Sequence, residues 1–268
     1  MSIVGIIAGK GDLPVVLSEE MVKEGKTPLV ISLDKDNCSA FRESAGDSVF
    51  SINVTQVGKI IKCLKKNNVK EIIFAGKVEK SLVFQKIAFD LTAIKLIAQL
   101  QNRNDDTIML KIIDFLEKEN DFKVLKQTDF LQPYILKSGI FCGKELNQSE
   151  REDVAYGFEK AKGIAGLDIG QTVIVKNKAV IAVEAIDGTD KTIQRAASLI
   201  DKGCIVVKVS KVGQDLRFDV PTIGSNTLEN MKLGKMKVIA FEAGKTFCPR
   251  PEKLRTFAKK NNITIVGI

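Results

Sequence analysis

The sequence predicts an α/β protein of two domains, an N-terminal doubly wound (Rossmann-like) parallel sheet and a C-terminal mixed α+β domain. Short apolar runs without polar alternation, which indicate strands buried on both faces, alternate with helical periodicity in the first half. In the second half, Asn177-Lys178 separates two apolar runs and predicts an antiparallel hairpin. The 268 residues are enough to build two hydrophobic cores.

In the N-terminal half, each expected strand is short and most end at a glycine or a polar residue. We expect strands at 3–8, 28–33, 71–75 and 122–125, and helices at about 12–24, 53–68, 82–100 and 104–119. Strands that alternate with helices in this way form a parallel sheet, whose ligands bind beyond the carboxyl ends of the strands. Gly9–Gly11, Asp34 and Gly76-Lys77 all fall at such ends.

The C-terminal half has a different order of elements. The segment 129–148 lacks clear periodicity and contains a proline and two glycines, so we expect a linker there, between domains at 1–128 and 149–268. Ser149–Glu152 resembles a capping box that opens a helix ending near Ala165. Beyond it we expect strands at 172–176, 179–184, 204–210, 237–242 and 263–268. We expect one helix after Asp187–Asp190 that ends at Ile200, and two more at 225–235 and at about 251–260.

The composition excludes several kinds of catalysis. The chain contains no histidine, which rules out a Ser-His-Asp triad, a Cys-His dyad and a His-ligated zinc site. Its five cysteines are scattered without a Cys-x-x-Cys pair, so we expect small core residues rather than metal ligands or disulfides. Catalysis would use carboxylates, lysines, arginines, hydroxyl groups or a hard cation such as Mg²⁺.

The charge of the chain favours anionic partners. Forty-one Lys and Arg against 33 Asp and Glu give a net charge of +8, which suits phosphorylated molecules or an anionic membrane face. We do not expect a nucleic-acid partner, because two tyrosines, no tryptophan and scattered lysines give no stacking platform. No apolar run approaches the ~18 residues that cross a bilayer, and residues 1–5 enter a strand directly, so we expect a cytoplasmic protein.

Two glycine-containing loops are candidate phosphate sites. Gly9–Gly11 follows the first strand and precedes a helix, an arrangement in which backbone amides and a helix N-terminus meet an anion. Gly76-Lys77 follows the third strand, where glycine permits close approach and lysine supplies a cation. Asp34 ends the second strand, where NAD-binding folds keep a ribose-binding acid. The alternative is structural: a tight strand-to-helix turn, a solvated lysine and an ordinary acid at a strand end.

Acidic residues gather in loops that precede expected helices. Asp105-Asp106 and Asp187–Asp190 each lie at a helix start, and the segment 214–224 contains Arg217 and Asp219. A carboxylate in such a loop suits Mg²⁺, while adjacent amides and Arg217 suit phosphate oxygens. The alternative at each position is a capping or salt-bridged aspartate, because acids in a first helical turn also favour the helix dipole.

Five segments occur along the chain in a characteristic order: Ala8–Pro14, Phe74–Val78, Asp168–Gln171, Val183–Asp190 and Arg217–Gly224. Together they resemble the LpxI-type UDP-2,3-diacylglucosamine pyrophosphatases, which act in lipid A synthesis in Gram-negative bacteria. The resemblance covers nearly the whole chain. The sequence departs from the family pattern at Lys10, where a small residue is usual, at Val212, where proline is usual, and at Lys80-Ser81, where Arg-Pro is common.

The resemblance implies Mg²⁺-dependent hydrolysis of the UDP-sugar diphosphate, by water attack on the α-phosphorus, to UMP and 2,3-diacylglucosamine 1-phosphate. It implies that Asp219 is the essential aspartate. The substrate-binding candidates are Gly9, Lys10, Gly11, Gly76, Lys77, Gln171, Thr189, Arg217 and Thr222. The candidate metal ligands are Asp219, Asp190, Asp105 and Asp106. The expected partners are the diacylated substrate and product and the cytoplasmic leaflet of the inner membrane, and a homodimer would be common for such an enzyme.

Two other functions remain open at this point. A nucleotide-cofactor oxidoreductase would use Gly9–Pro14 and Asp34, although the loop lacks a third glycine and the chain has no histidine to donate a proton. A non-enzymatic carrier of lipids or nucleotides would also suit the positive charge and the two domains.

Overall fold

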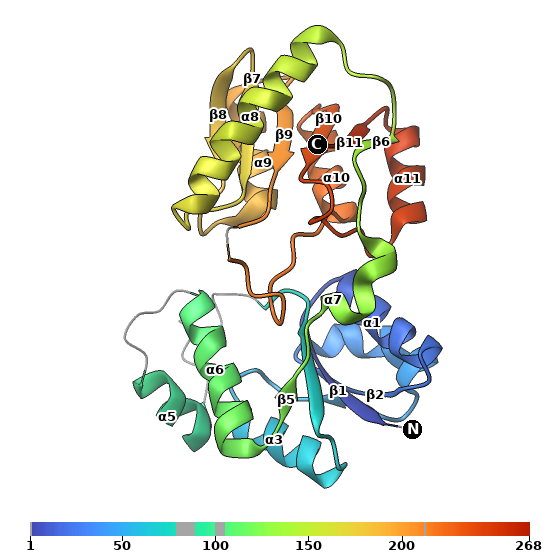
Figure 1. The fold of residues 1–268 in the computed structure, drawn as a ribbon, viewed down its shortest axis with the longest axis vertical. Helices are drawn as coiled ribbons and strands as arrows, with labels where there is room; N and C mark the ends of the chain where they lie inside the picture. The colour runs from blue at the N-terminus through green and yellow to red at the C-terminus, as the bar shows by residue number, and fades with distance from the viewer. Residues whose placement is uncertain (1, 79–88, 100–104, 212) are drawn as a thin grey trace. The chain divides into compact units, whose positions relative to one another are not determined.

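The computed structural model describes residues 2–78, 89–99, 105–211 and 213–268. These residues form two compact units (Figure 1). Unit 1 comprises Met1–Leu131 and Leu216–Asp219, and unit 2 comprises Gln132–Asp215 and Val220–Ile268. The short segment Leu216–Asp219 therefore belongs by its contacts to unit 1, although the residues on both sides of it belong to unit 2.

Unit 1 contains a five-stranded sheet in the order β3-β2-β1-β4-β5, in which every neighbouring pair is parallel. The strands are β1 (Ile3–Ala8), β2 (Thr27–Ser32), β3 (Val49–Ser51), β4 (Glu71–Ala75) and β5 (Lys123–Val124). The strand order reverses between β1 and β4, which is the usual ligand-binding position of doubly wound sheets. This arrangement confirms the predicted parallel sheet.

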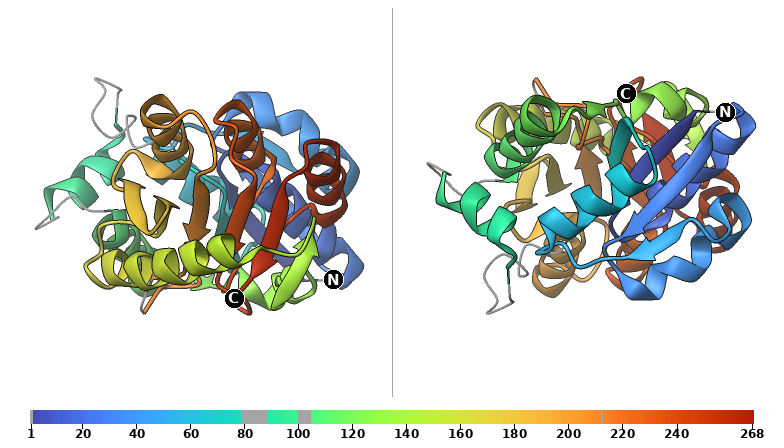
Figure 2. Two further views of the ribbon diagram at one scale, coloured as in Figure 1. Left: turned by 90° about the horizontal axis from the view of Figure 1, so that it is seen from above. Right: turned by 90° about the horizontal axis from the view of Figure 1, so that it is seen from below.

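Helices cover both faces of this sheet (Figures 1 and 2). One hydrophobic core joins side chains of α3 and α6 to the sheet, including Leu64, Ile113 and Ile72. Gly5 of β1 allows α3 to approach closely, because a Cβ there would lie 2.7 Å from Leu64 Cδ2. The helices are α1 (Asp12–Lys23), η1 (Lys35–Phe41), α2 (Arg42–Ala45), α3 (Val57–Lys66), α5 (Leu91–Ala98), α6 (Asp105–Asn120) and α7 (Thr128–Leu131).

The helix expected at 82–100 differs in the part that the structure describes. Residues 82–88 and 100 lie outside the described residues, and Phe89 and Asp90 are not helical. Helix α5 begins at Leu91 because the Asp90 carboxylate accepts a hydrogen bond from the Ala93 amide at 2.9 Å and caps the helix. The sequence analysis missed this capping aspartate because the apolar periodicity continues on both sides of it.

Unit 2 contains a six-stranded mixed sheet in the order β6-β11-β10-β9-β7-β8. The three central strands β9, β10 and β11 are parallel, whereas β6, β7 and β8 each pair antiparallel with a neighbour. The strands are β6 (Gly139–Cys142), β7 (Thr172–Lys176), β8 (Ala179–Val183), β9 (Ile205–Lys208), β10 (Val238–Phe241) and β11 (Thr264–Gly267). The predicted hairpin and mixed fold class are confirmed.

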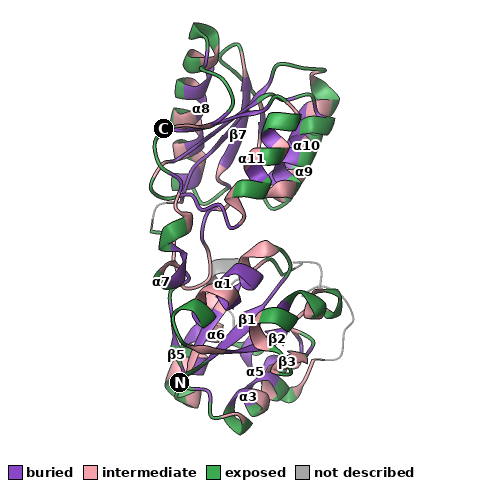
Figure 3. Cartoon of the chain, turned by 90° about the vertical axis from the view of Figure 1, so that its right-hand side faces the viewer, coloured by how far each residue is buried: buried purple, intermediate pink, exposed green. Residues whose placement is uncertain are grey.

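The helices of unit 2 form a layer on each side of its sheet (Figure 2, left). The helices are η2 (Gln132–Tyr134), α8 (Gln148–Gly166), α9 (Gly188–Leu199), α10 (Ser225–Leu233) and α11 (Pro251–Lys260). Helix α8 packs on one face through residues such as Val154 and Ala161, and the other three long helices share a core on the opposite face. The inner strands β7, β9, β10 and β11 are almost entirely buried (Figure 3), whereas the edge strands β6 and β8 expose part of their residues.

The segment expected to be a linker contains regular structure that the sequence analysis missed. Strand β6 lies within it and pairs antiparallel with β11 at the edge of the sheet. Four residues that begin with glycine are too few to show periodicity. The following helix begins at Gln148, and its capping box uses Asn147 and Glu150 instead of the expected Ser149–Glu152.

Candidate functional site

The loops after β1 and β4 are hydrogen-bonded to each other at the carboxyl end of the unit 1 sheet. The amide of Gly9 donates to the carbonyl oxygen of Ala75 at 2.8 Å. Lys10 and Lys77 exchange two backbone hydrogen bonds, at 2.8 and 3.0 Å. The structure therefore brings the candidates Gly9, Lys10, Gly76 and Lys77 together, but the amides of Gly9 and Lys10 already serve this contact.

Packing explains why two of these positions are glycine. A Cβ on Gly9 would lie 2.5 Å from the carbonyl oxygen of Lys77. Gly76 has a φ of +85°, and a Cβ there would lie 2.7 Å from the carbonyl oxygen of Lys10. Gly11 also has a positive φ, of +105°, but faces open space at the start of α1. At this edge, an anion would meet the lysine side chains and the start of α1 rather than the Gly9 amide.

Asp34 has a structural role at the end of β2. Its carboxylate accepts a hydrogen bond from the Asp36 amide at 3.2 Å and so caps η1. The same carboxylate lies 3.8 Å from the ammonium group of Lys10, whose side chain is half exposed. Asn37, which the sequence analysis did not single out, donates from its side chain to the Gly9 carbonyl oxygen at 3.3 Å. These contacts fit the structural interpretation of Asp34.

Unit 2 has a buried polar cluster around the first turn of α9. The hydroxyl of Thr189 donates to Glu184 at 3.1 Å and lies 3.3 Å from the hydroxyl of Thr172. The ammonium group of Lys208, at the end of β9, donates to Thr189 at 3.4 Å and to the carbonyl oxygen of Thr222 at 3.0 Å. The cluster thus joins two predicted residues, Thr189 and Thr222, through a lysine that is only 7% exposed.

Some buried side-chain oxygens of this region have no hydrogen-bond partner among the described residues. Oε2 of Glu184 and Oε1 of Gln171 are two of them. Gln171 directly precedes Thr172, whose carbonyl oxygen accepts from the Glu184 amide at 2.9 Å. A buried polar atom without a partner is costly, and such atoms are found where a ligand or an ion completes the contacts.

The segment that carries Arg217 and Asp219 is anchored in unit 1. The amide of Gln127 donates to the carbonyl oxygen of Leu216 at 2.9 Å, and Phe218 packs against the core of unit 1. Arg217 forms an ion pair with Glu117 of α6 at 3.3 Å. The side chain of Asp219 at the end of this segment is partly exposed to solvent.

The residues after Asp219 are fixed in unit 2. The Phe247 amide donates to the carbonyl oxygen of Pro221 at 2.8 Å, and the Ile223 amide donates to Phe247 at 3.0 Å. Together with the Lys208 contact to Thr222, these hydrogen bonds hold three consecutive residues, Pro221, Thr222 and Ile223, shortly after Asp219. The loop is thus held by short contacts on both sides of the aspartate.

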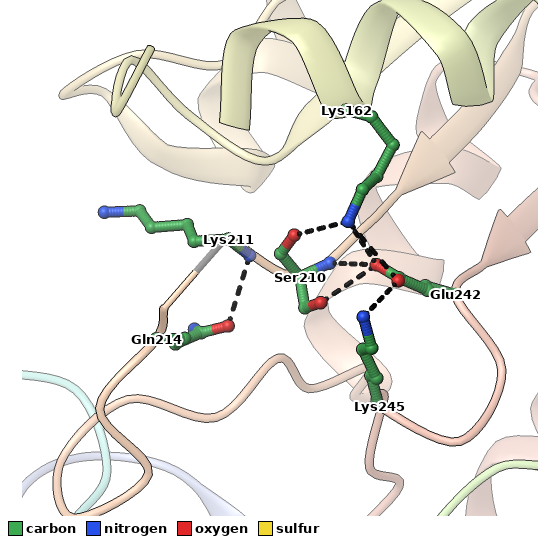
Figure 4. A network of polar contacts seen from close by, with 6 residues as sticks. All are labelled: Lys162, Ser210, Lys211, Gln214, Glu242 and Lys245. Carbon is green, nitrogen blue, oxygen red and sulfur yellow. Dashed lines mark hydrogen bonds and ion pairs between the residues drawn. The ribbon is translucent and has the colours of Figure 1, made fainter. Parts of the chain in front are cut away.

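A second network holds the beginning of the same loop (Figure 4). Glu242, at the end of β10, accepts hydrogen bonds from the amide and the hydroxyl of Ser210, both at 2.9 Å. It also pairs with Lys162 at 3.2 Å and with Lys245 at 2.8 Å. Burial alone would raise the pKa of Glu242, but hydrogen bonds from Lys245, Ser210 and Lys162 outweigh burial and lower the pKa to about 2.

The expected metal ligands are distributed over the fold. Asp190 lies in the first turn of α9 in unit 2 with one buried carboxylate oxygen, whereas Asp219 belongs to unit 1. The side chains of Asp105 and Asp106 lie outside the described residues. Within the described part of the chain, no three acidic or cysteine side chains form a group able to hold a metal ion.

Sequence reasoning missed Lys208, Glu184 and Glu117, which contact the predicted residues. Lys208 gave one usable signal, because a lysine ends an otherwise apolar run, Cys204–Val207, that predicts a buried strand. A buried lysine needs oxygen partners, so that pattern indicates a polar cluster. Glu117 gave no comparable signal, because it is one of several charged residues on an amphipathic helix.

Comparison with known protein families decides the relationship of this chain. The LpxI N-terminal domain model matches residues 3–134, and the LpxI C-terminal domain model matches residues 137–266. The chain belongs to the LpxI family. A relative from Caulobacter vibrioides, named UDP-2,3-diacylglucosamine pyrophosphatase LpxI, is 26% identical over 275 residues, which span 98% of this chain and 96% of the relative. The family resemblance predicted from the sequence is confirmed.

Among solved structures, the similarities to this LpxI family member are partial. The crystal structure of Cj0485 dehydrogenase matches with a TM-score of 0.27 and 15% identity, covering 44% of this chain and 48% of that one. N5-carboxyaminoimidazole ribonucleotide synthetase from Thermotoga maritima matches with a TM-score of 0.26 and 15% identity, covering 70% and 42%. Similarities this weak indicate nothing about function.

Proposed function

We propose that this chain hydrolyses the diphosphate of UDP-2,3-diacylglucosamine in lipid A synthesis, releasing UMP and 2,3-diacylglucosamine 1-phosphate. The observation that carries this proposal is the LpxI family membership along almost the whole chain, together with the name of the Caulobacter vibrioides relative. On this proposal the protein is a hydrolase that acts on a phosphorus anhydride, and a nucleotide-dependent oxidoreductase is disfavoured.

The charges near the candidate residues suit a diphosphate. Lys10 and Lys77 lie at the carboxyl edge of the unit 1 sheet, and Arg217 lies two residues before Asp219. Phosphoryl transfer depends mainly on positioning and on neutralising charge, so it proceeds without a histidine. Arg217 presents a planar fork of donors that matches phosphate oxygens.

Asp219 is the proposed catalytic residue. Its carboxylate would accept a proton from a water molecule as the water oxygen bonds to the α-phosphorus. The bond from that phosphorus to the bridging oxygen then breaks, and the sugar phosphate leaves with the bridging oxygen. Support comes from the hydrogen bonds that hold the neighbouring residues, Leu216 within unit 1 and Thr222 within unit 2.

Isotope labelling tests the direction of attack. Hydrolysis in ¹⁸O-labelled water should place the label in UMP, which mass spectrometry of both products detects. Label in 2,3-diacylglucosamine 1-phosphate would instead mean attack on the β-phosphorus. Binding of the UDP-lipid without any UMP release would favour a carrier, and tight binding of NAD(H), NADP(H) or a flavin in a titration would favour an oxidoreductase.

We also propose that the reaction requires Mg²⁺. The candidate ligands Asp219, Asp190, Asp105 and Asp106 are all carboxylates, which are the oxygen donors that Mg²⁺ prefers. When bound, the cation would neutralise charge on the diphosphate. Isothermal titration of the protein with Mg²⁺, before and after Asp219→Asn, tests the ligand role. Removal of Mg²⁺ by EDTA should stop UMP release and its return should restore it.

The proposed substrate carries two acyl chains, so we propose that the protein works at the cytoplasmic face of the inner membrane. Among the helices that the structure describes, none has the length and apolar character needed to cross a membrane. A homodimer is a further proposal, and sedimentation of the purified protein tests it.

A further inference from the structure

Helix α3 of unit 1 presents a concentrated positive charge. It carries Lys59, Lys62, Lys65 and Lys66, all with exposed side chains, and the segment 48–70 contains no acidic residue. Within the described residues, Lys59, Lys62 and Lys66 take part in no ion pair, and Lys65 contacts only the neutral side chains of Asn120 and Phe122. The charge of this helix is therefore available to an external anion.

The neighbouring helix α5 exposes apolar side chains. Leu91 is 80% exposed and Ile94 is 51% exposed, with the exposed Lys95 beside them. Ala93 and Leu96, on the opposite side of the helix, are buried in unit 1. The exposed face is thus an additional apolar surface, because the helix already has a buried one.

A direct contact places α5 against α3. The Asp90 carboxylate that caps α5 also accepts a hydrogen bond from the Gly58 amide of α3 at 2.7 Å. Gly58 has close contact with Thr92 as well, since a Cβ there would lie 2.9 Å from the Thr92 hydroxyl. The lysines of α3 and the apolar side chains of α5 therefore belong to adjoining helices, and we call their exposed residues the α3–α5 face.

An exposed leucine and isoleucine on a helix that adjoins a lysine-rich helix are typical of surfaces that lie on anionic bilayers. The lysines attract acidic headgroups, while the apolar side chains gain from leaving water at the acyl boundary. A nucleic acid would use the lysines as well, but it would leave Leu91 and Ile94 without a role and would lack aromatic side chains for stacking. The apolar component therefore favours a lipid surface.

We propose that the α3–α5 face of unit 1 docks on an anionic lipid bilayer. Lys59, Lys62 and Lys66 contact the headgroups, and Leu91 and Ile94 insert to the level of the acyl boundary. The inference rests on the proposed function only for its purpose, since a diacylated substrate resides in such a bilayer. The surface itself is defined by charge and exposure, so it is testable without substrate.

Sedimentation with substrate-free vesicles tests the docking surface. The intact protein should bind vesicles of phosphatidylglycerol and phosphatidylethanolamine, release them at high salt, and bind phosphatidylcholine vesicles weakly. The triple variant Lys59→Gln, Lys62→Gln, Lys66→Gln should lower partitioning by roughly a hundredfold, because each basic residue near the surface contributes about a factor of five. The double variant Leu91→Gln, Ile94→Gln should lower it by roughly tenfold or more.

The chain offers matched controls for both variants. Lys232, Lys259 and Lys260 of unit 2 are exposed, and replacing them with glutamine removes the same charge. Leu199 and Leu233, 63% and 78% exposed, match the apolar pair. Both control variants should partition as the intact protein does. The triple lysine variant of α3 should also retain UMP release from detergent-dispersed substrate, which separates docking from the proposed hydrolysis.

Several results would overturn the proposal. One is equal partitioning of the α3 variant and the intact protein onto anionic vesicles. Another is an equal loss of vesicle binding in the unit 2 lysine control, which would mean that net charge alone determines binding. Unchanged vesicle binding by the Leu91 and Ile94 variant with a raised KM for dispersed substrate would mean that this face contacts acyl chains of the bound substrate. Tighter binding to duplex DNA than to anionic vesicles, unaffected by the apolar variant, would mean a nucleic-acid surface.

Discussion

The ammonium group of Lys208 donates to the carbonyl oxygen of Thr222 at 3.0 Å, which ties the end of β9 to the segment that follows Asp219. The lysine is 7% exposed and also contacts the hydroxyl of Thr189 in the first turn of α9. A buried cation therefore connects two residues that the sequence analysis assigned to the substrate, although the lysine itself was not predicted.

Replacing Lys208 should lower kcat, because its contact with Thr222 positions the segment that follows Asp219. Lys208→Met keeps the aliphatic volume but leaves the Thr222 carbonyl oxygen without its charged donor. Hydrogen bonds to charged groups contribute about 1.5–3 kcal/mol, so we expect kcat to fall roughly ten- to hundredfold. Steady-state kinetics with dispersed substrate provides the measurement. Lys176→Met is the control. Lys176 donates to the carbonyl oxygen of Lys202 and lies at the end of β7 that is remote from Lys208, so kcat of this variant should stay unchanged.

The Arg217–Glu117 ion pair predicts a second positioning effect. Glu117 Oε2 lies 3.3 Å from Arg217, and Glu117 Oε1 accepts from the Val124 amide at 3.1 Å. Glu117→Gln keeps the second contact but removes the charge that orients Arg217, so we expect KM to rise about tenfold with a small change in unfolding temperature. Asp114→Asn, one turn away on α6 and paired, among the residues that the structure describes, only with Lys118, should leave KM unchanged. Equal effects of the two variants would argue against this role.

Glu242 predicts a specific dependence of stability on pH. Its pKa is held at about 2 in the folded state against about 4.5 when unfolded, so its contribution is complete above pH 4.5 and is lost as the pH falls toward 2. The contribution at neutral pH amounts to roughly 3 kcal/mol. Glu242→Gln should lose about that much at pH 7, and the difference from the intact protein should shrink in urea titrations below pH 4.5.

A surface glutamate serves as the control for this experiment. Glu252 is 86% exposed and, within the described part of the chain, forms an ion pair only with Arg255, so Glu252→Gln should change the free energy of unfolding by less than about 0.5 kcal/mol at any of these pH values. A difference between Glu242→Gln and the intact protein that persists unchanged at acid pH would mean that the variant disrupts packing rather than the ionised carboxylate.

The contact between the β1 and β4 loops predicts a large effect of a single methyl group. Gly9→Ala would place a Cβ 2.5 Å from the carbonyl oxygen of Lys77, and backbone on both sides has little room to move. We expect a loss of about 1–3 kcal/mol in the free energy of unfolding, measured by urea titration. Gly163→Ala, in α8 with nothing near its Cβ, should instead stabilise by about 0.5–1 kcal/mol.

The sequence predicted the architecture well where periodicity was strong. Strands 3–8 and 71–75 coincide with β1 and β4, and the hairpin at Asn177-Lys178 joins β7 and β8. Two short edge strands, β3 and β6, escaped prediction: they have three and four residues, and their pairing comes from neighbours distant in sequence. Asp90 was missed as a helix cap because apolar residues surround it on both sides.

Prediction of the candidate site was limited by contacts that depend on the fold. The Gly9–Gly11 and Gly76-Lys77 loops were expected at one sheet edge, and they lie there in direct contact. The sequence contains no indication that Gly9 and Gly76 are needed for packing between those loops. It also contains none that Leu216–Asp219 would join unit 1 while its flanking residues join unit 2, because that depends on long-range partners such as Gln127 and Phe247.

The most direct test of the central claim is UMP release from UDP-2,3-diacylglucosamine by the intact protein and by Asp219→Asn, each with Mg²⁺. The intact protein should release UMP and 2,3-diacylglucosamine 1-phosphate in equal amounts. Asp219→Asn should release neither above background while unfolding at the same temperature. Full turnover by Asp219→Asn would contradict the role of the aspartate, and no UMP from the intact protein would contradict the proposed function itself.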